Sequence, residues 1–122
     1  MFNIDIKKAT VENSNFRKVL YTGSHSQLVV MSIPVGGDIG EETHETIDQI
    51  LFFVEGNAEA ILNGQSSAVG PDGVVFVPAG TKHNFKNSGG KDLKLFTVYS
   101  PPGHKDGTVH ATKAEAEKEE KY

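Results

Sequence analysis

The chain has 122 residues, no cysteine and a formal net charge of −4 at neutral pH. This length fits one domain with a core of its own, and the lack of cysteine excludes disulfides and thiolate metal ligands. Its basic residues are scattered and its apolar runs are short, so we expect neither a nucleic-acid partner nor a membrane partner. The segment Met1 to Lys8 is charged and unlike a secretory signal, which favours a cytoplasmic protein.

Short apolar or β-branched runs separated by turn residues fill the middle of the chain. This spacing is typical of an all-β sandwich or barrel. The predicted strands cover residues 27–33, 49–55, 58–62, 65–69, 73–77, 81–85 and 93–99. Asn63-Gly64 predicts a two-residue hairpin turn, because both residues tolerate a positive φ. The segment 78–80 predicts a sharp bend.

The run 49–55 is apolar on both of its faces. A strand of this kind needs cover on each side. A barrel interior would cover one face, and a second sheet or a partner subunit would cover the other. We therefore expect a homodimer.

The C-terminal region differs in character from the strands. Residues 100–107 contain two prolines and predict a loop. Residues 112–121 predict a short helix, with Thr112 and Glu115 as a capping box and Glu117 and Lys121 as a favourable pair. A solvated tail is the alternative. We expect a single domain over 1–122, with its core at about 28–99 and the loop and helix at 100–122.

Two of the five histidines lie in informative surroundings. Glu42 and His44 are two residues apart, so in an extended segment both side chains point to one face. Gln49 lies at an odd offset from His44, and a turn or bulge over 45–48 would return it to the same side. His83 follows the predicted bend. In a closed barrel these four side chains would converge at its mouth.

A metal ion would explain these residue types. Imidazole nitrogens suit iron, manganese, nickel and zinc, and two histidines with one carboxylate resemble the pattern that holds non-haem iron. Glu42 supplies an anionic oxygen, and Gln49 a weak amide oxygen. The alternative is that both histidines are ordinary polar residues near strand ends.

Both segments together resemble the two motifs of the cupin superfamily. The first motif has a glycine, two histidines, a glutamate and a closing glycine at set intervals. The matching residues here are Gly36, Glu42, His44, Gln49 and Gly56. Every interval agrees, but Glu42 takes the place of the first histidine and Gln49 that of the glutamate.

The second motif contains glycine, proline, glycine, histidine and asparagine. Pro78, Gly80, His83 and Asn87 match it, while Asp72 stands where glycine is expected and Gly73 follows. The resemblance covers about residues 28–99. It implies a double-stranded β-helix, also called a jelly-roll barrel, with a divalent iron, manganese, zinc or nickel ion held by Glu42, His44, Gln49 and His83.

The whole chain is also similar to a group of small cupins described as mannose-6-phosphate isomerase-like. The residues behind this similarity are Glu41, Glu42, His44, Asp48, Gln49, Ser100, Pro101, Pro102 and His104. The description implies an isomerase by analogy, and fold analogy is a poor guide to reaction.

Tyr99 and Lys82 are candidates for proton transfer near the barrel mouth. Packing is the alternative for Tyr99, and a surface charge the alternative for Lys82. His25 is expected in an exposed turn. His104 and His110 flank the C-terminal loop, where we expect solvated side chains rather than a lid.

Three functions fit these observations. The first is a metalloenzyme acting on a small oxygenated metabolite, as a dioxygenase or a sugar isomerase, with Glu42 and Tyr99 as catalytic candidates. In an isomerase Glu42 would be a base rather than a ligand. The second is a pocket that binds a sugar or small acid without catalysis, and the third is a structural dimer module.

Overall fold

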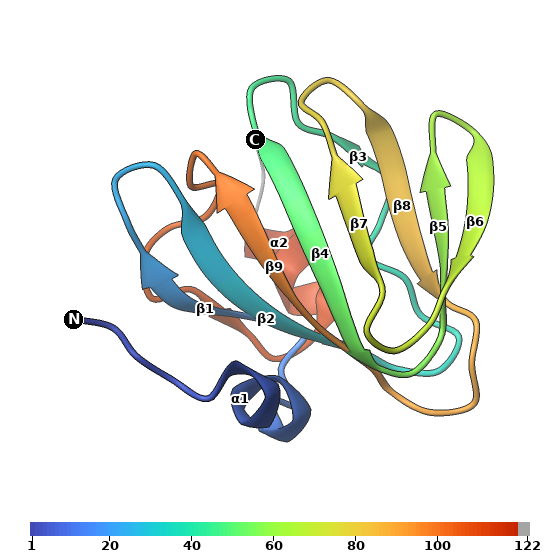
Figure 1. Ribbon diagram of the computed structural model, residues 1–122, viewed down its shortest axis with the longest axis horizontal. Coiled ribbons are helices and arrows are strands. Elements are labelled where there is room, and N and C mark those ends of the chain that lie inside the picture. Colours follow the sequence, from blue (N-terminus) through green and yellow to red (C-terminus); the bar gives the residue numbers. More distant parts are fainter. Residues whose placement is uncertain (120–122) are drawn as a thin grey trace.

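Two antiparallel sheets face each other across a shared apolar interior (Figure 1). The computed structural model describes residues 1–119. One sheet has six strands in the order β10-β1-β2-β9-β4-β7, and the other has four in the order β3-β8-β5-β6. The elements are α1 (Ile6–Glu12), β1 (Arg17–Thr22), β2 (Gln27–Ile33), β3 (Glu42–Thr43), β4 (Asp48–Glu55), β5 (Ala58–Leu62), β6 (Gln65–Val69), β7 (Val74–Val77), β8 (Lys82–Asn87), β9 (Leu93–Ser100), β10 (Val109–His110) and α2 (Lys113–Glu119).

The all-β prediction is confirmed, and the seven predicted strands are present within two residues of their expected bounds. Alternation along each strand sends one set of side chains inward. Leu51, Phe53, Leu95 and Phe85 are at most 1% exposed and come from both sheets. Burial of these side chains is the main force that holds the two sheets together.

The predicted turns also form. Asn63 and Gly64 have φ values of 49° and 81° and join β5 to β6 as a two-residue hairpin. At the bend before β8, the Thr81 N–H donates to the Pro78 carbonyl, and Gly80 has a φ of 85°. The substitution in the second motif leaves its turn intact, because Asp72 adopts a positive φ of 69°.

Four elements were not predicted: α1, β1, β3 and β10. Asp5 begins α1 by accepting a hydrogen bond from the Lys8 N–H at 3.1 Å, which is an N-cap. α1 packs on the outer face of the six-stranded sheet, where the Lys94 ammonium donates to the Asn13 carbonyl at 2.6 Å. Among residues 1–119, no helix is long and apolar enough to cross a membrane.

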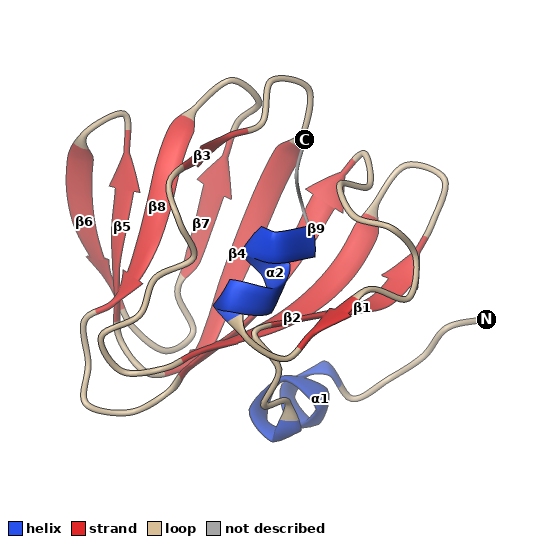
Figure 2. Cartoon of the chain, turned by 180° about the vertical axis from the view of Figure 1, so that it is seen from behind, coloured by secondary structure: helices blue, strands red, loops and turns tan. Residues whose placement is uncertain are grey.

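The C-terminal helix is confirmed and is docked rather than solvated. The Glu115 N–H donates to the Thr112 hydroxyl at 3.1 Å, which is half of the predicted capping box. Ala116 is 3% exposed and belongs to the core. α2 lies on the opposite side of the six-stranded sheet from α1 (Figures 1 and 2). The predicted pair of Glu117 with Lys121 lies outside the described residues.

The prediction of a solvated His110 is wrong. This side chain is 1% exposed, because β10 pairs with β1 and places His110 opposite Arg17. Its Nε2 lies 3.2 Å from a carboxylate oxygen of Glu119 on α2. A strand of two residues leaves no periodicity in the sequence, so nothing local indicated this burial.

Candidate metal centre

Main-chain contacts bring the two motif segments together. β3 pairs with β8, and Glu42 lies directly opposite His83 in that pairing. The Gly80 N–H also donates to the His44 carbonyl at 2.8 Å. Main-chain hydrogen bonds therefore fix the backbone positions from which these three side chains project.

Gln49 lies at an odd offset from His44, yet it faces inward because the chain passes from one sheet to the other between these two residues. A turn at residues 45–46 separates β3, in the four-stranded sheet, from β4, in the six-stranded sheet. Gln49 enters β4 facing inward and is 3% exposed. The carboxylate of Asp48 beside it accepts a hydrogen bond from the Ala79 N–H at 2.9 Å, which ties β4 to the bend of the second motif.

Glu42, His44 and His83 form a compact cluster of metal-binding groups. One ligand atom from each lies within 4.8 Å of those of the other two. Three ligand atoms bound tetrahedrally to one ion at about 2.1 Å would be about 3.4 Å apart, so the side chains would have to close by up to about 1.4 Å around an ion. Tyr99 packs beside this cluster, with its ring centroid 6.1 Å from that of His44.

Hydrogen bonds orient two of the four predicted ligands. The Nδ1 of His83 lies 2.8 Å from the Thr81 carbonyl, so it carries the proton and leaves the Nε2 lone pair available. The amide nitrogen of Gln49 donates to the Thr97 hydroxyl at 3.2 Å, and that hydroxyl donates to the Ile50 carbonyl. These partners act as the outer contacts that hold metal ligands in position.

Two of the buried side-chain atoms that have no hydrogen-bond partner within residues 1–119 belong to predicted ligands: the Nε2 of His44 and the Oε1 of Gln49. The nearest charged oxygen to the His44 nitrogen belongs to Glu42, at 3.6 Å, beyond hydrogen-bond length. Buried polar groups without a partner are costly and rare. A metal ion bound by Glu42, His44 and His83, with Gln49 beside it, would satisfy both atoms.

The electrostatics favour a neutral His44. Burial lowers the pKa of His44 below its usual value, and the charges of His83, His104 and Arg17 lower it further, while Glu42 opposes the change. Neutral imidazole is the form that binds metal ions. Arg17 contributes from β1, where it is 3% exposed, and no local sequence pattern indicated its place near the cluster.

A third histidine lies at the edge of the centre. The His104 ring packs edge-on against Tyr99, with centroids 5.0 Å apart. Gln27 holds this loop, since its Oε1 accepts from the N–H groups of Gly103 and His104 and its amide donates to the His104 carbonyl. His104 is half-buried rather than solvated as predicted, and Gln27 is a site residue that the sequence analysis missed.

Two other candidates lie at the surface. His25 is exposed, as expected. The Lys82 ammonium lies 3.6 Å from the Glu41 carboxylate, and both side chains are more than 60% exposed, so Lys82 is a surface charge. A hollow of about 170 Å³ borders the cluster and includes Arg17 and Glu42 in its lining.

The chain is similar to several known proteins. The family described as Cupin domain matches residues 29–99. The uncharacterized protein YrkC of Bacillus subtilis is 43% identical over 94% of this chain and 65% of its own length, so the chain spans less than two thirds of that relative. The uncharacterized protein L612 of Acanthamoeba polyphaga mimivirus is 35% identical, over 89% of this chain and 71% of its own.

A solved structure shares the whole architecture. The crystal structure of BH2720 from Bacillus halodurans has a TM-score of 0.95 and 41% identity, and the match covers 96% of this chain and 93% of that one. This agreement extends over both sheets and the terminal helices.

Proposed function

This chain belongs to the cupin domain family, and from that premise we propose that Glu42, His44 and His83 bind a divalent metal ion used on a small oxygenated metabolite. One observation supports this most directly: three ligand atoms lie within 4.8 Å of one another beside two buried acceptors that lack partners within the described chain. Iron, manganese, zinc and nickel all suit this ligand set. Gln49 would complete the centre as a weak ligand or by holding a water.

The ligand charge supports a metal although the family's usual residues are exchanged. Glu42 stands at the position of the motif's first histidine, and Gln49 stands at the position of its glutamate. The set of four residues therefore still contains one carboxylate, and its total charge is unchanged. A bound ion would act as a Lewis acid toward a carbonyl, enediol or carboxylate. Tyr99 packs against both His44 and His104, and we propose Tyr99 as a catalytic candidate on the strength of these contacts.

Two reaction classes fit this centre. Iron would suit a dioxygenase, whereas manganese, zinc or nickel would suit an aldose–ketose isomerase. Both act on small polar molecules, and a hollow of about 170 Å³ lined by Arg17 and Glu42 is open beside the cluster. Oxygen consumption with diketones and catechols tests the first class, and turnover of sugar phosphates tests the second.

Binding without catalysis is the second candidate function. Glu42 is the one carboxylate of the described cluster. If it serves as a ligand, it is not available as a base, and this favours a site that binds a sugar or a small acid. Ligand binding with no turnover in either screen would support this alternative.

Metal analysis tests the bound metal ion, which both candidate functions require. We expect close to one equivalent of metal per chain in tag-free protein purified without chelator, and a loss of at least tenfold in His83→Ala, because a buried nitrogen ligand is removed. His25→Ala is the matched control, since His25 is exposed and lies outside the cluster. Less than ~0.1 metal per chain, with no gain on adding Fe(II) or Mn(II), would falsify the proposal.

A further inference from the structure

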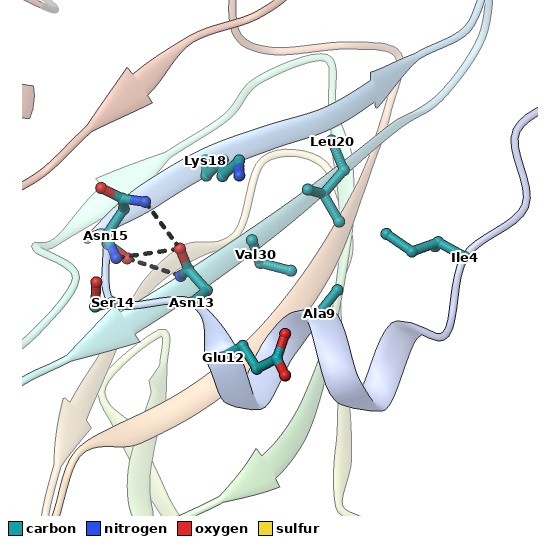
Figure 3. A pocket seen from close by; sticks show the side chains of 9 residues that line it. All are labelled: Ile4, Ala9, Glu12, Asn13, Ser14, Asn15, Lys18, Leu20 and Val30. Carbon is teal, nitrogen blue, oxygen red and sulfur yellow. Dashed lines mark hydrogen bonds between the residues drawn. The ribbon is translucent and has the colours of Figure 1, made fainter.

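Arg17 is the only arginine of the sequence, and its side chain lies inside the molecule. It is 3% exposed at the start of β1, where it shares the inward face of the strand with Val19. Strand pairing places it between Met31 of β2 and His110 of β10, which are also buried. Lys18 beside it faces the other side of the sheet and lines a hollow next to α1 (Figure 3). Of these two neighbouring basic residues, β1 therefore turns only the arginine inward.

Burying the charge of an arginine is costly. The guanidinium stays protonated throughout the pH range of proteins, so burial cannot neutralise it. Replacing a buried charge by an apolar side chain of similar volume is often neutral or stabilising for a fold. Apolar neighbours for such a replacement are present in Phe16 and Met31 of the core. The stability of the fold therefore does not require an arginine at this position.

Arg17 borders the same hollow as the candidate metal ligand Glu42. The hollow has a volume of about 170 Å³ and is lined by the segment that leads into β3 and by α2. Phe16 and Ile39 form an apolar part of its wall and are at most 7% exposed. One water occupies about 30 Å³ of the liquid, so the hollow has room for a molecule of roughly the volume of five or six waters. A small metabolite can therefore lie between Arg17 and the metal cluster.

The charge of Arg17 reaches this cluster. Burial is the main cause of the lowered pKa of His44, and the charge of Arg17 adds to it. Buried charges are screened by solvent much less than exposed ones. The other charged groups that line the hollow differ in this respect, because Glu41 and Glu117 are exposed and the Lys113 ammonium is already in an ion pair. Arg17 therefore makes the inner end of the hollow positive.

The centre and Arg17 together have an excess of positive charge when a divalent ion is bound. Glu42 is the one carboxylate of the described cluster. A divalent ion would therefore leave one positive charge there, and Arg17 adds a second. Buried charges require compensation by a partner of opposite sign. A ligand with two negative charges would compensate both.

We propose that the small oxygenated ligand of this centre is an anion, and that Arg17 binds its carboxylate or phosphate group in the hollow. This substrate class rests on the proposed function, because it concerns the ligand of the same centre. The planar guanidinium suits either group, since two parallel N–H groups can donate to two anionic oxygens. Arg17 is held by the surrounding strands before the ligand binds, and a side chain that is already ordered loses little entropy on binding.

The single arginine allows a test on the unaltered protein. Protein labelled with nitrogen-15 in arginine gives one guanidinium Nε–Hε signal in a nuclear magnetic resonance spectrum. We expect malonate to shift this signal saturably in metal-free protein, and at about tenfold lower concentration after loading with zinc, because the second carboxylate can then reach the ion. Malonamide, which is of nearly the same size and uncharged, should leave the signal unchanged.

Methyl phosphate in a parallel titration separates the two kinds of anion. Tighter binding of malonate assigns a carboxylate ligand to the centre, and tighter binding of methyl phosphate assigns a phosphate ligand. Both results support an anionic ligand held by Arg17.

Two substitutions test the same contact by calorimetry. Arg17→Met keeps the length of the side chain and removes its charge, so we expect malonate affinity to fall by about 10- to 100-fold. Arg17→Lys keeps the charge without the paired donors, and its affinity should lie between the two. Lys18→Met is the matched control, because Lys18 is exposed on the other face of β1, and it should bind malonate as wild type does. Far-ultraviolet circular dichroism shows whether each variant folds.

An arginine signal that malonate leaves unchanged overturns the proposal, and this result does not depend on the folding of any variant. A folded Arg17→Met that binds malonate as tightly as Lys18→Met overturns it as well. The metal content of wild type tests the proposed function separately. Wild type without metal whose arginine signal responds to malonate rejects the metal and keeps Arg17 as an anion site. Wild type with metal and no response keeps the metal and rejects the anionic ligand.

Discussion

His44 is a partly buried imidazole that the surrounding residues keep neutral. Burial lowers its pKa, and the opposing effect of Glu42 does not overcome that of burial. A lowered pKa means that His44 loses its proton at a lower pH than a free imidazole. His44 is therefore ready to bind a metal throughout the neutral range.

The first prediction concerns pH. Metal affinity should stay nearly constant between about pH 8 and pH 7 and should fall in acid, because protons then compete for the ligands. Competition titration with a fluorescent chelator across this range measures the effect, with His25→Ala as the control. An affinity that already declines between pH 8 and pH 7 would contradict a neutral His44.

The second prediction concerns the contribution of Gln49 to metal binding. Its Oε1 is buried without a partner among the described residues, and Thr97 holds its amide nitrogen. We expect Gln49→Ala to weaken metal binding by about 10- to 100-fold, the range usual for groups that support a metal centre. The loss should be smaller than that of His83→Ala, and equal losses would make Gln49 a full ligand.

Much of the candidate centre could be predicted at the scale of single residues. Glu42, His44 and His83 form the expected cluster, and Gln49 faces inward opposite Tyr99; their roles as ligands, and that of Tyr99 in catalysis, stay predictions. Gln27, Arg17 and the packing of His104 were missed. Gln27 bonds to a loop 77 residues away in sequence, and no local pattern indicates such a contact.

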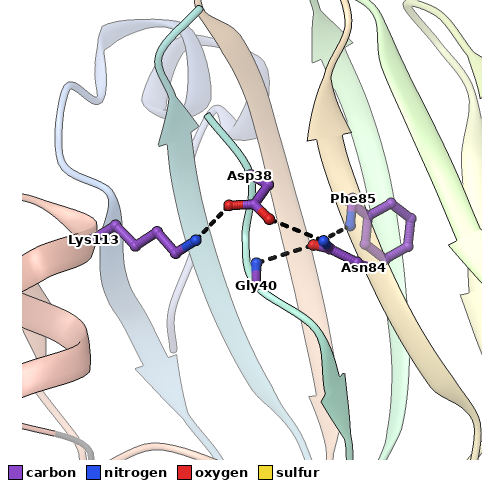
Figure 4. Close-up of polar contacts among 5 residues, drawn as sticks. All are labelled: Asp38, Gly40, Asn84, Phe85 and Lys113. Carbon is purple, nitrogen blue, oxygen red and sulfur yellow. Dashed lines mark hydrogen bonds and ion pairs between the residues drawn. The ribbon is translucent and has the colours of Figure 1, made fainter. Parts of the chain in front are cut away.

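At the scale of elements, α2 is fastened by one polar network. The Lys113 ammonium pairs with the Asp38 carboxylate, and the Asn84 amide donates to the same carboxylate at 2.9 Å (Figure 4). Asn84 also accepts from the Gly40 and Phe85 N–H groups. The hydrogen bond from Lys113, followed by that from Asn84, lowers the pKa of Asp38 below 3.8.

The third prediction follows from this network. A carboxyl with a lowered pKa contributes stability above the unfolded-state pKa and loses it as pH falls through the folded-state pKa. Asp38 and Lys113 are each about one-third exposed, which weakens the pair. Asp38→Asn should cost about 0.5–1 kcal/mol at neutral pH and much less in strong acid.

Denaturant unfolding and hydrogen exchange over residues 113–119 measure this change. Glu41→Gln is the control, because its pair with Lys82 is more than 60% exposed on both sides and should contribute almost nothing. Equal effects of the two substitutions, or protection of α2 that is unchanged in Asp38→Asn, would contradict the role assigned to this network.

The loop after β9 depends on Gln27 in a similar way. Its amide is 1% exposed and bonds to Thr22, Gly103 and His104. The fourth prediction is that Gln27→Ala costs about 1–3 kcal/mol and speeds hydrogen exchange of residues 101–107. Metal affinity should be unchanged, which separates positioning of His104 from metal binding.

Gln65→Ala is the matched control for that experiment, since Gln65 is exposed in the hairpin. Exchange in residues 101–107 that is equally slow in both variants would show that the loop is held by other contacts.

The strands were predictable because they combine β-branched residues with clear turn signals. α1 and β1 were not, for different reasons. α1 is seven residues long and depends on packing against the sheet for its stability. β1 begins with Arg17 and Lys18, which read as solvent-exposed, although pairing with β2 and β10 buries the first of them.

At the scale of the whole molecule, the two sheets have different surroundings. One has an outer face that is polar, and the other has an outer apolar face partly covered by α1. The sequence indicated this asymmetry through the run 49–55, which is apolar on both sides. The cytoplasmic location, the single-domain organisation and the absence of nucleic-acid or membrane partners stay predictions.

The bond from the Gly80 N–H to the His44 carbonyl has a consequence for how such a centre can change over time. Because peptide groups rather than side chains fix the separation of the two segments, the donors themselves are interchangeable. Glu42, for example, stands where it does because its backbone pairs with that of His83. We expect a substitution of one such side chain to change which ion is preferred, while the backbone separation of the two segments stays the same.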